Sequence, residues 1–237
     1  MRASWGWVGA CPVSCDRHTN VARLIWSREL LGTSVMKRPT SIIIALLIFV
    51  ATPIHSAVAG DAVAGKVKAQ LCAACHGADG NSANSQFPSL AGQVPGYIAA
   101  QLTLFKSGNR ANPVMAGMVA PLSQTDIQDL DAYFSAQQSI LGSISETDVK
   151  AAESGGTLYR GGFKALGVAP CMGCHGPAGR GIPPKYPRLT GQHPEYLERQ
   201  LQAFKTKTRK HRVMSPIAFL LTPQQMWEVS LYVSALK

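Results

Sequence analysis

Two short runs of this sequence carry the same chemical groups at the same spacing. Each run has two cysteines separated by two residues and a histidine directly after the second cysteine. These residues are Cys72, Cys75 and His76 in the first run, and Cys171, Cys174 and His175 in the second. The pattern is that of c-type haem attachment, in which both thiols form thioethers with the porphyrin and the adjacent imidazole binds the iron. We therefore expect two covalently bound haem c groups.

The similarity between the two runs extends along the chain at a constant offset of 99 residues. The offset holds without a gap for more than sixty residues, which indicates two homologous domains. We place these domains at residues 60–140 and 155–237, with residues 141–154 as a polar linker. The repeated positions include Pro88 and Pro187, Leu90 and Leu189, Gln93 and Gln192, Tyr97 and Tyr196, and Phe105 and Phe204.

Other uses of paired cysteines fit this arrangement less well. One structural zinc would need both pairs to meet, yet 96 positions separate Cys75 from Cys171, and zinc ribbons close over shorter loops. A thioredoxin-like redox site would need a βαβ context, and the sequence shows none. The histidine that follows the second cysteine in both runs also favours haem.

The repeat also selects the second ligand expected for each iron. A methionine thioether in that position raises the reduction potential relative to a second histidine. Met115 maps onto Met214, so these two residues are the candidates. Three methionines and two histidines have no counterpart in the other half, and we expect core packing for the methionines and surface or structural roles for the histidines. They are Met118, Met172, Met226, His193 and His211.

Helical patterns predominate in both halves. Val63, Val67 and Leu71 recur at four-residue spacing, and residues 97–106 form a segment that ends before a glycine. Each half ends in a segment with a helix-start signal, which is strongest where Thr222 and Gln225 form a potential capping box. Alternating strand patterns are not convincing, so we predict an all-α fold. Four repeated aromatics are expected to pack around the haems: Tyr97, Tyr196, Phe105 and Phe204.

The first 59 residues have the features of export rather than of a folded domain. A basic start at Met36, an apolar run over residues 42–51 and the small residues 57–59 follow the order of a secretory signal. We predict a cleaved signal peptide at 36–59, periplasmic localisation, and a mis-assigned or dispensable extension at 1–35. Cys11 and Cys15 lack partners for a metal site. The apolar run is shorter than the roughly 20 residues of a membrane-spanning helix, so a polytopic membrane protein is excluded.

Charge differs sharply between the two halves. Residues 60–140 carry four basic and five acidic side chains, a net charge of −1, whereas residues 155–237 carry twelve and three, a net of +9. Much of this excess lies in residues 205–212, directly before Met214. We expect this end to meet an acidic partner surface, with a solvated face or peripheral association with an anionic membrane as the alternatives. We expect no nucleic-acid partner for an exported haem protein.

Taken together, the sequence resembles the dihaem class I cytochromes c, and among them the cytochrome c4 family. The resemblance covers residues 60–237 and rests on both Cys-x-x-Cys-His-Gly motifs, both Pro-x-Leu-x-Gly-Gln segments, residues 157–162 and the methionines in register. It implies two tandem class I cytochrome c domains related by an approximate two-fold axis. It also implies ligation of one iron by His76 and Met115, and of the other by His175 and Met214.

The resemblance further implies a periplasmic, non-enzymatic shuttle of single electrons. Its redox partners would be a quinol-oxidising complex or a dehydrogenase on one side and a terminal oxidase or reductase on the other. A second reading is the electron-accepting cytochrome subunit of a periplasmic dehydrogenase. A third reading is a dihaem peroxidase, which would need one iron with an open or displaceable position. The repeated methionines argue against that enzyme.

Overall fold

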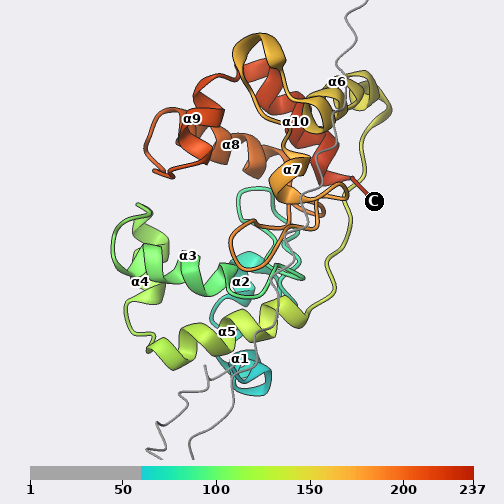
Figure 1. Ribbon diagram of the computed structural model, residues 1–237. Coiled ribbons are helices and arrows are strands. Elements are labelled where there is room, and N and C mark those ends of the chain that lie inside the picture. Colours follow the sequence, from blue (N-terminus) through green and yellow to red (C-terminus); the bar gives the residue numbers. More distant parts are fainter. Residues whose placement is uncertain (1–59) are drawn as a thin grey trace, which may run out of the picture. The chain divides into compact units, whose positions relative to one another are not determined.

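The computed structural model describes residues 60–237. In this part of the chain the regular elements are helices, together with three isolated β-bridges. The all-α prediction is therefore confirmed (Figure 1). The predicted leader, residues 1–59, and its Cys11 and Cys15 lie outside the described residues.

Each half contains the same succession of helices. The first half comprises α1 (Ala62–Ala69), α2 (Ala73–His76), α3 (Tyr97–Lys106), α4 (Pro113–Val119) and α5 (Gln124–Ala136). The second half comprises α6 (Val149–Gly161), α7 (Met172–His175), α8 (Pro194–Lys205), α9 (Met214–Phe219) and α10 (Pro223–Ser234), with short 3-10 turns η1 (Glu146–Asp148) and η2 (Lys164–Leu166). Helix α6 starts inside the segment 141–154 that we expect to be the linker.

Local sequence explains where the last helix of each half begins. At α5, the Ser123 hydroxyl accepts the N–H of Asp126 while the Asp126 carboxylate accepts the N–H of Ser123. Thr222 and Gln225 form the same capping box at α10, as the sequence predicts. Such reciprocal bonds satisfy two N–H groups that a helix start leaves without partners.

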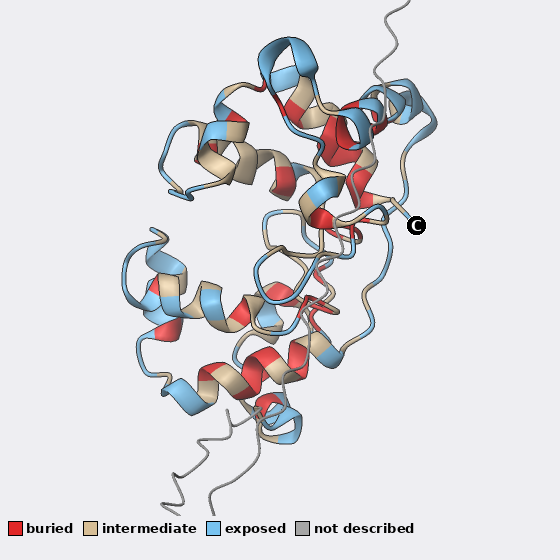
Figure 2. Cartoon of the chain, in the orientation of Figure 1, coloured by how far each residue is buried: buried red, intermediate tan, exposed pale blue. Residues whose placement is uncertain are grey.

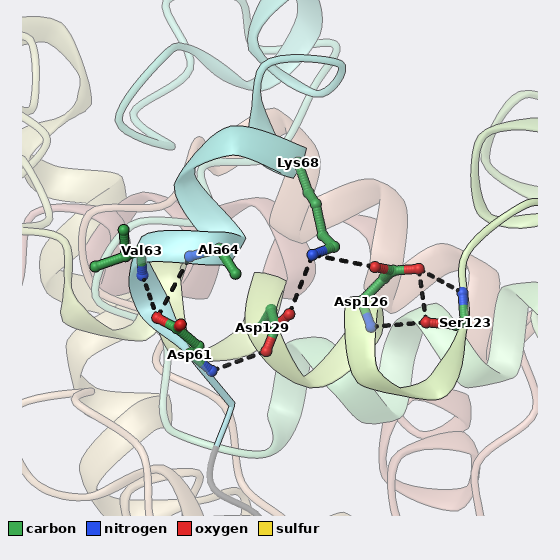
Figure 3. Close-up of polar contacts among 7 residues, drawn as sticks. All are labelled: Asp61, Val63, Ala64, Lys68, Ser123, Asp126 and Asp129. Atoms are coloured by element: carbon green, nitrogen blue, oxygen red, sulfur yellow. Dashed lines mark hydrogen bonds and ion pairs between the residues drawn. The ribbon is translucent and has the colours of Figure 1, made fainter.

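The first and last helices of each half cross at very short distance. A Cβ atom added to Gly65 of α1 would lie 2.0 Å from the carbonyl oxygen of Asp129 on α5, and one added to Gly155 of α6 would lie 2.0 Å from that of Glu228 on α10. In the first pair, Lys68 forms ion pairs with Asp126 and Asp129 beside the crossing (Figure 3). Glycine is therefore required at both crossings.

Helix α1 buries a different face from the one its apolar spacing suggests. Val63, Val67 and Leu71 are 75%, 65% and 70% exposed, while Gly65 and Ala69 are buried against α5. The spacing correctly predicts a helix. Its packing face, however, is set by the small residues that allow close approach.

The two halves differ in how much apolar core their side chains form. Buried residues, coloured red, lie along α5 in the first half and along α10 in the second half (Figure 2). The core cluster of the second half has ten buried members and includes Tyr159 and Met226, both 0% exposed. The corresponding cluster of the first half has five buried members: Ala69, Ile98, Leu130, Tyr133 and Phe134. Domains with cores this small commonly need an additional stabilising group.

Reciprocal contacts join the two halves. The backbones of Arg110 and Arg209 form an antiparallel bridge, and these residues are 99 positions apart. The Arg110 guanidinium donates to the Tyr196 hydroxyl at 2.9 Å, and that of Arg209 donates to the Tyr97 hydroxyl at 3.1 Å. Because each contact has a counterpart in the other direction, the halves are related by an approximate two-fold axis.

The repeated aromatics accordingly divide into two groups. Phe105 and Phe204 are buried, as expected for core residues. Tyr97 and Tyr196 are only half-buried, and their hydroxyl groups accept hydrogen bonds from the opposite half. The phenolic oxygen of each tyrosine lies at the boundary between the halves. The packing of the two rings around the haems stays a prediction.

Candidate functional site

Each Cys-x-x-Cys-His run forms a single helical turn. In the first half, the N–H of His76 donates to the Cys72 carbonyl at 2.9 Å, and in the second, the N–H of His175 donates to the Cys171 carbonyl at 2.9 Å. Residues three and four positions apart lie on the same face of such a turn. Both thiols and the imidazole of each run can therefore face one group placed beside the turn.

The four cysteines of these runs are half-buried and are not paired in disulfides. Burial raises the pKa of Cys72, and it raises the pKa of Cys171 to about 11, so both groups are neutral thiols at neutral pH. Within residues 60–237, the structure gathers no cluster of three or more histidine, cysteine or acidic side chains that could hold a metal ion. The zinc alternative has no support in this part of the chain.

The two histidines are oriented by backbone carbonyl groups. The His76 Nδ1 atom lies 2.8 Å from the Pro88 oxygen, and the His175 Nδ1 atom lies 2.9 Å from the Pro187 oxygen. Because a carbonyl oxygen only accepts, Nδ1 carries the proton in both rings. This leaves Nε2 of each imidazole with a lone pair available for a metal.

Burial favours the neutral form of both rings. His76 and His175 are each 7% exposed, and burial lowers the pKa of each by more than the proline carbonyl raises it. A neutral imidazole is the form that binds iron. Sequence patterns do not identify these prolines as partners of the histidines, although the repetition of a proline after each motif was the available signal.

A loop with unusual backbone angles follows each histidine. Gly77 and Gly176 have φ angles of 82° and 79°, a conformation that residues with a side chain rarely adopt. A Cβ atom at Gly77 would also lie 2.3 Å from the Asn81 carbonyl oxygen. The glycines thus turn the chain sharply toward the proline that contacts the imidazole.

The candidate methionines lie in the first turns of equivalent helices. Met115 lies in the first turn of α4, where its N–H donates to the Asn112 side chain at 2.9 Å, and Met214 is the first residue of α9. Both side chains are half-buried. In α9, the N–H of Met214 donates to Nδ1 of His211 at 3.1 Å, so His211 has a structural role.

The remaining methionines occupy three different environments. Met226 is fully buried in the core and Met172 packs against that core, as expected. Met118 is 42% exposed, so the expectation of core packing is wrong for this residue. The ring of His193 contacts the Ser82 carbonyl of the other half at 2.9 Å, which is also a structural role.

The residues of each half match the requirements of a c-type haem. Each site offers two thiols and one oriented, neutral imidazole from a single turn, and a methionine lies in the first turn of a helix elsewhere in the same half. Haem supplies one-electron redox chemistry, and the protein supplies ligands, burial and docking charge. The small clusters of buried side chains fit a domain whose core is completed by such a group.

Comparison with known proteins agrees with this geometry. The family model of cytochrome c matches the chain twice, over residues 62–137 and 161–237. Cytochrome c4 of Azotobacter vinelandii is 41% identical over 192 residues, which cover 75% of this chain and 90% of that protein. The crystal structure of reduced recombinant cytochrome c4 from Pseudomonas stutzeri superposes with a TM-score of 0.72 and 37% identity, covering 76% of this chain and all of the other.

A relative with a more specific name shows a similar match. A protein named thiosulfate dehydrogenase electron acceptor, from Stutzerimonas stutzeri, is 34% identical over 169 residues. The match covers 69% of this chain and 78% of that relative.

Proposed function

We propose that this chain, which belongs to the cytochrome c family and carries two c-type haems, is a periplasmic electron carrier. In this proposal His76 and Met115 ligate one iron, and His175 and Met214 ligate the other. It would receive single electrons from a quinol-oxidising complex or a dehydrogenase and deliver them to a terminal oxidase or reductase. The cysteines of each run would hold the porphyrin covalently.

One observation carries the histidine assignment. In both halves a buried imidazole of the Cys-x-x-Cys-His turn is held through Nδ1 by a proline carbonyl, so that Nε2 remains free. An imidazole that only filled space in a core would not need the same proline contact in two copies. A partner on the second nitrogen is the usual way to orient a metal-binding histidine.

Met115 and Met214 are the methionine ligands of choice because they occupy equivalent positions of the repeat, in the first turns of equivalent helices. Substituting either by histidine should lower the potential of one haem and leave the other nearly unchanged, since a thioether stabilises ferrous iron better than imidazole. Spectroelectrochemical titration of the purified dihaem protein measures both potentials. The long-wavelength charge-transfer band of the methionine–ferric bond should fall by half in each variant.

Met118 provides the matched control for this test. Met118→Leu should leave both irons six-coordinate, because this exposed side chain has no counterpart in the other half. A high-spin iron in Met118→Leu, or loss of the whole band from one histidine substitution, would contradict the assignment. Six-coordinate ligation of both irons also argues for a carrier rather than a peroxidase, and a peroxidase assay on the same sample tests that alternative.

Export to the periplasm is supported by the signal-like order of residues 36–59 and by the haem attachment motifs. Among residues 60–237, no helix combines the length and apolar character needed to cross a bilayer. The mature protein should begin close to Gly60, and mass spectrometry of the periplasmic fraction would identify that end.

A second candidate function is that of electron-accepting subunit for a dehydrogenase. It is favoured by the similarity to a protein named thiosulfate dehydrogenase electron acceptor. Stopped-flow mixing with a purified thiosulfate dehydrogenase and its substrate would distinguish the two roles. Rapid, saturable haem reduction would support a dedicated acceptor, whereas slow reduction would leave the general carrier.

The basic segment 205–212 supports an acidic partner at the second half, although not all of its charges face solvent. Lys205 donates to the carbonyls of Phe219 and Leu221, and Arg209 lies in the contact between the halves. The exposed cations of the segment are Lys207, Lys210 and Arg212. Any electrostatic steering should therefore come from these three residues.

A matched pair of double variants tests this docking surface. Lys210→Gln with Arg212→Gln should slow electron exchange with an acidic partner severalfold at low salt, because complementary charge raises the encounter rate. Lys66→Gln with Lys150→Gln removes two exposed charges elsewhere and should have little effect. The difference should shrink as salt rises, since the Debye length is about 10 Å at 0.1 M.

Equal rates for both double variants at all ionic strengths would make the basic segment a solvated face. Salt-sensitive binding to vesicles that contain anionic lipid, with unchanged electron exchange, would instead make it a membrane-binding surface. Either outcome would remove the acidic partner from the proposal and leave the haem assignment intact.

A further inference from the structure

Two glutamines at equivalent positions reach across the boundary between the halves. The Gln93 amide accepts the backbone N–H of Arg188 at 2.7 Å and donates to the carbonyl of the same residue at 3.1 Å. The Gln192 amide makes the same pair of bonds to Ser89, both at 2.9 Å. Gln93 and Gln192 are each only 9% exposed. Each side chain therefore holds one residue of the opposite half by both of its backbone groups.

The residue held by each glutamine belongs to the peptide that orients a histidine. The N–H of Ser89 and the carbonyl of Pro88 are the two ends of one peptide group, and that carbonyl contacts Nδ1 of His76. A continuous chain of hydrogen bonds thus runs from the His76 imidazole through this peptide to Gln192. The equivalent chain in the other direction joins His175, the Pro187–Arg188 peptide and Gln93.

Hydrogen bonds linked through one peptide group strengthen one another. A peptide whose N–H donates to an amide oxygen becomes a better acceptor at its carbonyl. An imidazole that donates Nδ1–H to a better acceptor is a more basic ligand at Nε2. A more basic ligand favours ferric iron and lowers the reduction potential, as outer hydrogen bonding does at haem sites in general.

We propose that Gln93 and Gln192 are positioning residues that tune the haem of the opposite half. Gln93, in the first half, acts through Arg188 and Pro187 on His175, and Gln192 acts in the same way on His76. This inference rests on the proposed binding of iron by the two histidines. It makes the contact between the halves a determinant of both potentials.

The other contacts across the boundary do not reach these peptides. Arg199 donates to the carbonyls of Ser85 and Gln86, and Arg209 donates to Tyr97 and Gln101. General loosening of the boundary would therefore shift the same haem or haems in a Gln93 variant and in a Gln192 variant. A glutamine that acts through the peptide would affect only the opposite haem, and this crossed pattern is the signature to test.

Gln93→Leu removes both polar groups and nearly preserves the volume of the side chain. In the dihaem protein it should raise the reduction potential of the haem in the second half, and leave that of the first half at its wild-type value. Gln192→Leu should do the reverse. Spectroelectrochemical titration measures both potentials, and Met115→His in the same background identifies the haem of the first half.

Amide hydrogen exchange supplies a readout that does not depend on the iron. The N–H of Arg188 should exchange faster in Gln93→Leu, and the N–H of Ser89 should remain protected. Arg199→Leu removes bonds across the same boundary and should leave both N–H groups protected. Gln93→Glu keeps an acceptor for the Arg188 N–H, so the reduction potential of the haem in the second half should stay at or below its wild-type value. This variant tests the proposal even if Gln93→Leu does not fold.

Three results would overturn the proposal: a shift confined to the haem of the mutated half, equal shifts of both haems, or faster exchange at Arg188 with both potentials unchanged. Failure of the underlying function would look different. In that case the wild-type protein itself would lack two low-spin haems, whatever the rates of amide hydrogen exchange at Arg188 and Ser89.

Discussion

The closest helix crossing of the second half allows a stability prediction with an internal control. An alanine Cβ at position 155 would lie 2.0 Å from the oxygen and 2.3 Å from the carbon of the Glu228 carbonyl, and 2.7 Å from the nitrogen of Val229. These are backbone atoms, so no side chain can move aside. To bring the nearest contact to 3.0 Å, α6 and α10 must separate by about 1 Å, a gap that forfeits a quarter to a half of the dispersion energy of the facing atoms.

The cost of Gly155→Ala follows from this separation. Leu158, Tyr159, Val229 and Val233 are buried in the core cluster that α6 and α10 build together. Overpacking of a core costs typically 1–3 kcal/mol, and here it opens a helix pair, so we expect about 3 kcal/mol of destabilisation. For a chain of this size that corresponds to a fall in Tm of roughly 6–12 °C.

Gly161→Ala places the same methyl group on the same helix where it meets nothing. No heavy atom lies within 4 Å of that Cβ position, so the better helix propensity of alanine should stabilise the protein by about 0.5 kcal/mol. Thermal unfolding of both haem-loaded variants, followed by circular dichroism, tests the pair. If Gly155→Ala melts with the wild type, or if both variants lose the same Tm, the steric reasoning is wrong.

Three further predictions concern single polar groups. The Ser230 hydroxyl is fully buried with no hydrogen-bond partner among the described residues, so Ser230→Ala should stabilise the protein by about 1 kcal/mol in a denaturation assay. In the same assay Ser234→Ala should destabilise the protein, because it loses a hydrogen bond to the Leu231 carbonyl. Lys207 has a φ angle of 60°, so Lys207→Gly should raise stability by up to about 1 kcal/mol. Hydrogen bonds from Ser123, and then Lys68, lower the pKa of Asp126 from 3.8 to about 2 (Figure 3). The ionised Asp126 carboxylate therefore contributes fully to stability above about pH 4, and this contribution is lost as the pH falls toward 2. The difference in Tm between the wild type and Asp126→Asn should vanish over that range.

Local patterns predict much of the fold because they act over a few residues. The segment 97–106 coincides with α3, and the capping box at Thr222 begins α10 as expected. The prediction of exposure was less successful. Met118 and the apolar residues of α1 face solvent, because burial depends on which neighbour a helix meets, and Gly65 rather than Val63 determines that contact.

The candidate site shows the same limit. Spacing alone identifies the cysteines and histidines, since they lie within one helical turn. The carbonyl that orients His76 comes from Pro88, twelve positions away, and the amide that holds the next residue comes from Gln192, more than one hundred positions away. Periodicity carries no information on contacts at such separations. The offset of 99 nevertheless marked Pro88 and Gln192 as repeated, without indicating what they contact.

The two halves form several reciprocal bonds where they meet, yet they differ in net charge. Gln93 and Gln192, and Arg110 and Arg209, are identical across the repeat and bond reciprocally. The net charges of the same halves are −1 and +9. Reciprocal bonds require matched residues on both sides of the boundary, whereas the charges of the outer surfaces are under no such constraint.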